Sequence, residues 1–342
     1  MIDAETIDSQ ETMGSGHPPD EQALQEFVSG AQQLEAAVQS VIIGQSEVVR
    51  ETVIALLAGG HVLLEGVPGL GKTLLVRTLA AALDLSFSRV QFTPDLMPAD
   101  ITGTTILRED EHGGRSFAFQ AGPVFAHLVL ADEVNRATPK TQSALLEAMQ
   151  EHTVTVGNDT HRLPLPFFVL ATQNPLEMEG TYPLPEAQLD RFLLKILVPF
   201  PRGDVLMSIV QTTLVPAVTP SPVLDGRRLG AMIETARAVP IATPIARYAV
   251  SLLEATHPQW SEIETVQRYV RAGASPRGLQ ALVTCAQVRA LLEGRFNVAI
   301  ADIQALAKPA LRHRILLNFD GQAEGLKSES IIDAVLEAIP VR

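Results

Sequence analysis

The chain has 342 residues, of which 46% are hydrophobic, and its formal net charge is −13. This length allows two folded units of unequal size and predicts a globular protein. No apolar run reaches the roughly 18 to 20 residues of a membrane span, and the N-terminus is acidic where a signal peptide begins basic, so we expect a cytoplasmic protein without membrane insertion. Cys285 is the only cysteine, which excludes an intramolecular disulfide and a multi-cysteine zinc site, and we interpret it as a core residue.

The acidic residues are concentrated near the N-terminus, where nine Asp and Glu and no Lys or Arg precede Arg50. Residues 1–22 are polar, contain glycine and proline and lack apolar periodicity, which predicts a disordered acidic tail. The chain has only five Lys and no basic run, so it lacks the charge pattern of a protein that binds nucleic acid tightly. This charge argument does not cover a basic pore that forms only when several chains assemble.

A helical pattern at 24–38 is followed by five strand-like apolar runs. The runs cover 61–64, 87–92, 127–131, 167–171 and 193–198, with helical patterns such as 73–83 and 141–151 between them. Strands that alternate with helices predict a parallel five-stranded sheet between helices. We therefore expect an α/β domain over residues 23–201.

Two segments interrupt this alternation. Residues 102–120 form a polar, glycine-containing segment that a plain alternation does not require. Residues 153–165 alternate between polar and apolar around Gly157-Asn158, a turn pair typical of hairpins. Both segments are predicted to be insertions into the core sheet.

The chain after residue 201 predicts a second, all-α domain. Residues 202–225 include a stretch rich in Pro and Thr and are interpreted as a linker region. The helical patterns cover 203–214, 226–238, 244–256, 276–293, 300–317 and 330–338. Residues 226–342 are therefore expected to form a helical domain.

A glycine-rich loop follows the first of the five strands and leads into a helical pattern. The loop and the residue after it are Gly66, Val67, Pro68, Gly69, Leu70, Gly71, Lys72, Thr73 and Leu74, a complete Walker A sequence between a strand and a helix. In such a loop the backbone N–H groups and the helix N-terminus surround phosphates. Lys72 can reach the β and γ phosphates, and the Thr73 hydroxyl can ligate Mg²⁺.

Polar residues also end two other strands. Asp132 and Glu133 follow the run 127–131, where the first carboxylate can hold Mg²⁺ through water and the second can activate the attacking water. Asn174 follows the run 167–171, where its amide could hydrogen-bond the γ phosphate or that water. The adjacent glutamate and the lack of an NKxD sequence separate the chain from P-loop GTPases. These residues predict hydrolysis of ATP with Mg²⁺.

With these motifs the chain resembles the MoxR family of AAA+ ATPases, in the branch that carries a helix 2 insert. The resemblance leaves out only the first ~25 residues and parts of the helical domain. The matching segments are 41–45, 91–103, 132–137, 171–175, 182–192, 273–277 and 311–315. Such a set is far more specific than a Walker motif alone.

The resemblance implies roles for further residues of the nucleotide site. It makes Asn174 the sensor 1 residue, and Arg277 the sensor 2 residue that contacts the γ phosphate from the helical domain, or lid. Gly44 and Gln45 would lie near the adenine.

The resemblance also identifies Arg191 as an arginine finger that acts on the ATP of a neighbouring subunit. An ion pair of Arg191 with Asp190 or a nearby glutamate is the alternative. Arg136 could also face the subunit boundary, and the sequence does not choose between its roles. Residues 102–120 become the helix 2 insert and 153–165 the pre-sensor 1 hairpin, which in related rings project toward the pore or the substrate face. An ordinary hairpin core would explain the insert's aromatic residues equally well.

The implied function is that of an ATPase acting as a homo-oligomeric ring, expected to be a hexamer. It would be a chaperone-like remodeller or maturation factor for a protein client, with a von Willebrand factor A domain protein as partner. Two alternatives stay open. One is a nucleic-acid motor of the helicase-related AAA+ branch, which the acidic charge disfavours. The other is a nucleotide-gated scaffold without turnover, which the set Lys72, Asp132, Glu133 and Arg191 disfavours.

Overall fold

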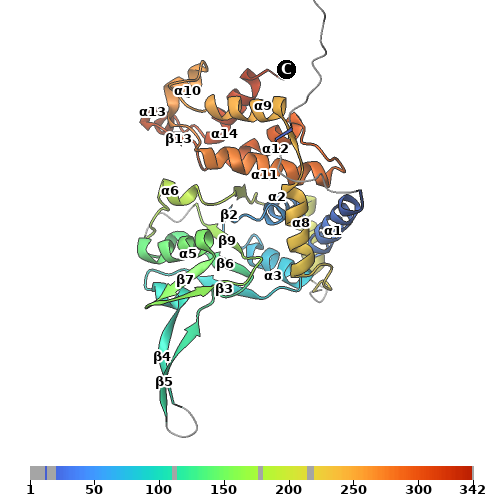
Figure 1. Cartoon of the computed structure of the whole chain (residues 1–342). Coiled ribbons are helices and arrows are strands. Elements are labelled where there is room, and N and C mark those ends of the chain that lie inside the picture. Colours follow the sequence, from blue (N-terminus) through green and yellow to red (C-terminus); the bar gives the residue numbers. More distant parts are fainter. Residues whose placement is uncertain (1–11, 14–20, 110–113, 176–179, 214–218, 341–342) are drawn as a thin grey trace, which may run out of the picture. The chain divides into compact units, whose positions relative to one another are not determined.

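The computed structural model describes residues 12–13, 21–109, 114–175, 180–213 and 219–340, and the chain forms two compact units (Figure 1). The first unit is Ser29–Ile233. The second combines Glu234–Arg342 with the N-terminal residues up to Val28. None of the helices in these ranges is long and apolar enough to span a membrane.

A five-stranded parallel sheet forms the centre of the first unit, as the apolar runs predict. Its order is β10-β2-β9-β6-β3, and every neighbouring pair is parallel. The strands are β2 (Val62–Glu65), β3 (Phe87–Gln91), β6 (Leu128–Asp132), β9 (Phe168–Gln173) and β10 (Leu194–Leu197). Because all five run in one direction, their carboxyl ends meet at the same edge of the sheet.

The three central strands explain why polar groups gather at that edge. Strands β2, β6 and β9 are buried at every position except the last, as expected for strands covered on both faces. Their last residues, Glu65, Asp132 and Gln173, are half-buried and polar. Each strand therefore delivers a polar side chain where it leaves the core.

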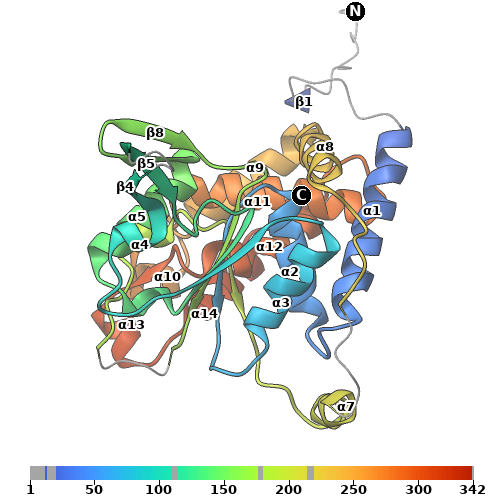
Figure 2. The same ribbon diagram turned by 90° about the horizontal axis from the view of Figure 1, so that it is seen from below.

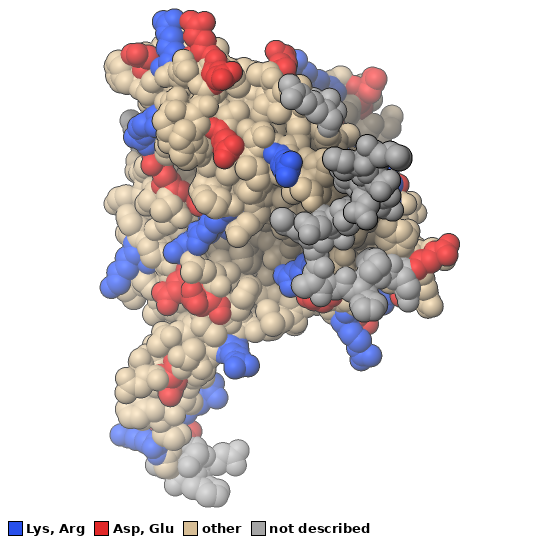
Figure 3. Space-filling model, turned by 45° about the horizontal axis from the view of Figure 1, so that its top comes forward, with Lys and Arg blue, Asp and Glu red and all other residues tan. Residues whose placement is uncertain are grey.

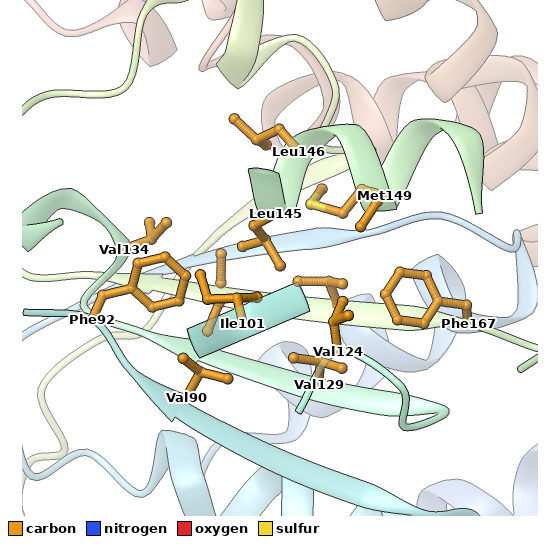
Figure 4. Close-up of a cluster of buried hydrophobic side chains, with 14 of the residues drawn as sticks. Val90, Phe92, Ile101, Val124, Val129, Val134, Leu145, Leu146, Met149 and Phe167 are labelled. Carbon is orange, nitrogen blue, oxygen red and sulfur yellow. The ribbon is translucent and has the colours of Figure 1, made fainter. Parts of the chain in front are cut away.

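Several helices and one 3-10 turn accompany this sheet in the first unit. They are α2 (Ser46–Leu57), α3 (Lys72–Ala82), α4 (Pro98–Thr102), the 3-10 turn η1 (Val134–Arg136), α5 (Pro139–Glu151), α6 (Glu186–Leu189) and α7 (Asp204–Thr213). Side chains of α4, α5 and the sheet gather in one buried cluster, in which Phe92, Ile101 and Leu145 are fully buried (Figure 4). Burial of one such side chain contributes about 1.5–3 kcal/mol, so this cluster fixes α5 on the sheet.

Two antiparallel hairpins extend from the first unit. Strands β4 (Gly103–Glu109) and β5 (Arg115–Ala121) form the longer hairpin, which points away from the sheet (Figure 1). Strands β7 (Thr153–Val156) and β8 (Asp159–Arg162) form the shorter one. The hairpins lie side by side (Figure 2), and the Phe119 ring stacks on the His161 ring with 3.8 Å between their centroids.

The second unit is mainly helical. It contains α9 (Thr243–Glu254), α10 (Glu264–Tyr269), α11 (Pro276–Leu292), α12 (Ile300–Leu311), α13 (Phe319–Ala323) and α14 (Ser328–Ala338). Helices α1 (Glu21–Gln39) and α8 (Gly226–Arg237) contribute to both units. Short strand pairs β1 (Thr12–Met13) with β11 (Ile241–Ala242), and β12 (Val270–Ala272) with β13 (Leu316–Leu317), complete it.

For one helix of this unit the predicted length is wrong. The pattern at 300–317 predicts a single helix, but α12 ends at Leu311 and Leu316–Leu317 form strand β13. The apolar residues of this stretch fit either a helix or a short strand, and the pairing partner β12 lies more than 40 residues away in the sequence. Local periodicity therefore cannot separate the two.

Candidate nucleotide site

The Walker A loop connects β2 to α3. Gly69 and Gly71 have positive φ angles of 82° and 77°, and open space surrounds the position of a Cβ at both, so backbone conformation is what requires glycine there. At Gly66 a Cβ would lie 3.0 Å from the Val198 carbonyl oxygen, so close approach is what requires glycine. Helix α3 begins at Lys72, directly after Gly71. The loop thus presents a helix N-terminus, which attracts anions.

Lys72 lies over this loop. Its Nζ donates a 2.6 Å hydrogen bond to the Gly66 carbonyl oxygen. Partial burial lowers the pKa of Lys72, while the charges of Asp132, Glu133 and Glu65 raise it. Thr73, in the first turn of α3, is half-buried.

The remaining loop residues differ in exposure. Leu70 is buried, Val67 is half-buried, and Pro68 and Leu74 are exposed. Gln45 Nε2 donates to the Leu70 carbonyl oxygen at 2.9 Å, which ties the segment before α2 to the Walker A loop. Gly44 has a φ of 71°, and a Cβ there would lie 2.2 Å from Val205 Cγ1 of α7. Gly44 and Gln45 thus lie between the loop and α7.

Asp132 ends β6 with both carboxylate oxygens bonded. Oδ1 accepts a 2.6 Å hydrogen bond from the Thr172 hydroxyl of β9. Oδ2 accepts from Arg89 of β3, at 2.7 Å from Nη2 and 3.2 Å from Nε. Side chains from both neighbouring strands therefore fix the orientation of this carboxylate.

Glu133 adopts the left-handed backbone conformation, with φ 57° and ψ 48°. A residue other than glycine in this region is strained by about 1–3 kcal/mol and needs support from its surroundings. Its N–H donates to the Thr172 hydroxyl oxygen (2.8 Å). Its Oε2 accepts from Gln91 Nε2 (2.7 Å) and Arg136 Nη1 (2.8 Å). Three neighbouring side chains thus hold this residue in place.

Sequence reasoning missed some of these partners. It gave no role to Thr172, Arg89 or Gln91 and left the role of Arg136 undecided. One available signal was the alternation along β3, which places the polar Arg89 and Gln91 on the same face of a strand. Their link to Asp132 and Glu133 depends on the pairing of β3 with β6, which the sequence does not reveal.

Three more predicted site residues lie at other positions. Asn174 is buried and directly follows β9, whose last carbonyl, that of Gln173, accepts a 3.3 Å hydrogen bond from the Gly66 N–H. Arg191 lies between α6 and β10, and its Nε is buried without a hydrogen-bond partner among the described residues. Arg277 belongs to the second unit, where it is exposed in the first turn of α11.

The residues present fit a nucleotide with Mg²⁺. The glycine loop, the start of α3 and Lys72 offer hydrogen-bond donors and positive charge for phosphates. Asp132 and Thr73 offer the oxygen ligands that Mg²⁺ prefers, and Mg²⁺ commonly takes its remaining ligands from phosphate and water. The first unit thus combines a loop that fits phosphates, a carboxylate, Asp132, that could hold the metal ion, and a second carboxylate, Glu133, beside it.

Comparison with known proteins agrees with this geometry. The model of the ATPase family associated with various cellular activities (AAA) matches residues 61–194, and the AAA lid domain matches residues 263–335. The chain is 42% identical to the uncharacterised protein YeaC of Bacillus subtilis, over 89% of this chain and 92% of that protein. It is also 42% identical to Chaperone MoxR1 of Mycobacterium tuberculosis, over 88% of this chain and 80% of that protein.

A further relative and a solved structure extend the comparison. Protein MoxR of Paracoccus denitrificans is 35% identical over 90% of this chain and 95% of its own length. The crystal structure of a proposed ATPase from Cytophaga hutchinsonii is 39% identical, has a TM-score of 0.88, and covers 94% of this chain and 98% of that one. Since relatives of this similarity span most of its length and both AAA models match it, the chain belongs to the MoxR family of AAA+ ATPases.

Proposed function

We propose that this chain binds ATP with Mg²⁺ at the Walker A loop and hydrolyses it. The observation that carries the proposal is the pair Asp132 and Glu133, held by side chains of β3 and β9 beside a phosphate cradle with its lysine. Gly44 and Gln45 would contact the adenine, and the residues from Gly66 to Leu74 would contact the phosphates. Mg²⁺, held by Thr73 and Asp132, would neutralise charge on the phosphate oxygens.

Glu133 is the proposed general base, which takes a proton from the attacking water. Its supported left-handed backbone aims the side chain while Thr172 holds the N–H. Asn174 would orient the water or the γ phosphate, since an amide can donate and accept hydrogen bonds without taking the proton. Lys72 supplies positive charge at the β and γ phosphates, and Arg277 is proposed to reach the γ phosphate from the second unit.

Two variants test hydrolysis. Lys72→Ala should lose most ATP affinity, because the charge that meets the phosphates is removed. Glu133→Gln should bind ATP but turn it over about 10²–10⁴-fold more slowly, because the amide keeps the shape but cannot accept the proton. Binding is read from the fluorescence of a labelled ATP analogue and turnover from phosphate release. Full affinity in Lys72→Ala would remove the Walker A assignment, and parental turnover in Glu133→Gln would remove the general base.

We further propose that the active form is a homo-oligomeric ring, expected to be a hexamer, in which Arg191 acts on the ATP of a neighbouring subunit. The match of Arg191 to the family's finger position supports this role, and its side chain is half-buried between α6 and β10. Arg191→Ala should lower turnover about 10³–10⁵-fold while ATP affinity changes little. Mixing it with Lys72→Ala should restore part of the activity through hybrid interfaces. No recovery, in mixtures shown to co-assemble, contradicts a finger that acts in trans.

For the task of the ring we propose chaperone-like remodelling or maturation of a protein client, with a von Willebrand factor A domain protein as partner. The relative named Chaperone MoxR1 supports this. The longer hairpin supports it as well, since Leu107 and Phe117 lie opposite each other on β4 and β5 and are 55% and 79% exposed. On the face drawn in Figure 3, basic and acidic side chains are interspersed, which favours a protein client over nucleic acid. Pull-down with Glu133→Gln, with and without ATP, tests for a client.

A further inference from the structure

Arg89 is joined to both carboxylates of the site, although it is neither in the Walker A loop nor at a strand end. It lies on β3, one of the two edge strands of the sheet, two residues before Gln91, whose strand partner is Asp132. Its Nη2 bonds Asp132 Oδ2 at 2.7 Å and Gln91 Oε1 at 2.9 Å. Gln91 in turn donates to Glu133 Oε2 at 2.7 Å. One guanidinium therefore contacts the metal-binding carboxylate directly and the general base through a single amide.

These contacts differ from an ordinary surface ion pair. The Asp132 side chain is only 13% exposed, whereas that of Arg89 is 48% exposed. Two donors of Arg89 meet the same oxygen, and the Thr172 hydroxyl bonds the other. Both oxygens of Asp132 are thus satisfied before a metal ion arrives, and its negative charge is already balanced by a neighbour.

This balance has a consequence for metal binding. A free Mg²⁺ at Asp132 would place two positive charges beside Arg89, whose Nη2 lies 2.7 Å from that carboxylate. A metal ion that arrives with ATP brings the negative phosphates as well, and these meet Lys72 and the helix N-terminus. Arg89 should therefore weaken the binding of free Mg²⁺ but not the binding of Mg²⁺ together with ATP.

We propose that Arg89 is a positioning residue that orients Asp132 and balances its charge, so that Mg²⁺ binds well only together with nucleotide. The proposal rests on the ATP and Mg²⁺ site proposed above. Arg89 does not touch the reacting atoms. It acts through Asp132. Through Gln91 it also holds the Glu133 side chain at a fixed position relative to the Asp132 carboxylate.

The test measures metal binding without turnover. Mn²⁺ serves as a paramagnetic substitute for Mg²⁺, and binding to the nucleotide-free chain is followed by the loss of the free-ion signal in electron paramagnetic resonance. Arg89→Gln should bind Mn²⁺ about fivefold more tightly than the parent, because one adjacent positive charge is gone. Arg89→Lys, which keeps the charge, should stay close to the parent. Arg237→Gln, which removes the same charge from an exposed pair with Glu234, is the matched control and should not change the affinity.

Two results would overturn the proposal. One is an unchanged Mn²⁺ affinity in Arg89→Gln, and the other is an equal gain in Arg89→Lys, which would show that the charge is not responsible. Mn²⁺ binding that is too weak to measure in every chain, Arg89→Gln included, counts as an unchanged affinity. Binding of a fluorescent, non-hydrolysable ATP analogue with Mg²⁺ is measured in the same chains. A parent chain that fails to bind that analogue with Mg²⁺ would contradict the proposed function, whereas normal binding with unchanged metal affinity would contradict only the role of Arg89.

Discussion

Asp302 in the second unit and Asp132 in the first each pair with an arginine, but their partners differ in origin. Asp302 has a side chain that is 1% exposed, and Arg295 bonds both its oxygens, at 2.7 and 2.9 Å. The N–H of Ala299, before the first turn of α12, donates to the same carboxylate at 2.8 Å. These groups come from one short stretch of chain, to which Arg289 of α11 adds a contact of 3.6 Å with Oδ1. Asp132 draws its partners from β3 and β9, about 40 residues away on either side.

The difference separates a structural ion pair from one for which we propose a function. The Asp302 pair caps its own helix, is extended only by the Arg289 contact, and contains no predicted site residue. The Asp132 pair continues through Gln91 to a second carboxylate with a strained backbone. It also lies where three strands deliver polar residues beside a phosphate-binding loop. Bond lengths alone, 2.7 Å in both cases, would not separate them.

The largest expected effect that tests this comparison is on stability. Asp302→Ala should reduce the free energy of unfolding by about 3 kcal/mol, because Arg295 and the Ala299 N–H lose a buried partner. Asp333→Ala is the matched control, since Asp333 pairs with Lys308 at 2.7 Å but is 50% exposed. It should cost less than about 1 kcal/mol. Denaturant unfolding followed by circular dichroism measures both, and equal losses would mean that burial does not distinguish the pairs.

The converse substitution should separate activity from stability. Asp132→Asn keeps the shape of the side chain but removes the charge that would hold Mg²⁺, so ATP turnover should fall at least about 100-fold. The free energy of unfolding should change by less than about 1 kcal/mol, because the amide can still accept hydrogen bonds at one oxygen. Phosphate release and denaturant unfolding on the same preparation give both values. A large loss of stability with normal turnover would reverse the assignment of the two aspartates.

A smaller effect concerns His61, a buried titratable group of the first unit whose hydrogen bonds are to neutral backbone groups. Its Nδ1 accepts from the Val169 N–H (3.1 Å), so Nε2 carries the proton and donates to the Met149 carbonyl oxygen (3.0 Å). Burial lowers the pKa of His61 to about 4, with the Met149 bond opposing this shift and His152 adding to it.

Because the unfolded chain binds a proton at His61 below about pH 6.5 and the folded chain does not until about pH 4, stability should fall as the pH drops through this window. At pH 5 the loss should be about 2 kcal/mol. Unfolding free energies at pH 7 and pH 5 measure it, and His61→Gln, which cannot titrate, should show a flatter dependence. Identical pH dependence in the two chains would contradict the neutral buried histidine.

The parts of the fold that the sequence predicted are those that depend on neighbouring residues in the chain. The five strands are continuous apolar runs, and the Walker A glycines follow one of them directly, so both could be read locally. Contacts between distant segments could not. Arg89 meets Asp132 only because β3 pairs with β6, and Leu316–Leu317 become a strand only because β12 lies beside them. The proposed target of Arg191, the ATP of a neighbouring subunit, lies outside this chain, so the local pattern of the sequence could not reveal it.

The left-handed backbone of Glu133 sets selection for folding against selection for catalysis at one position. Glycine adopts that conformation without strain, so Glu133→Gly should relieve it while removing the proposed base. A library of variants at this position, screened only for thermal stability, should therefore be enriched in glycine. The selected variants should be stable but unable to hydrolyse ATP. A lineage released from the need to hydrolyse ATP would drift in the same direction. The residue found at this position in a related chain should therefore indicate whether that chain still hydrolyses ATP.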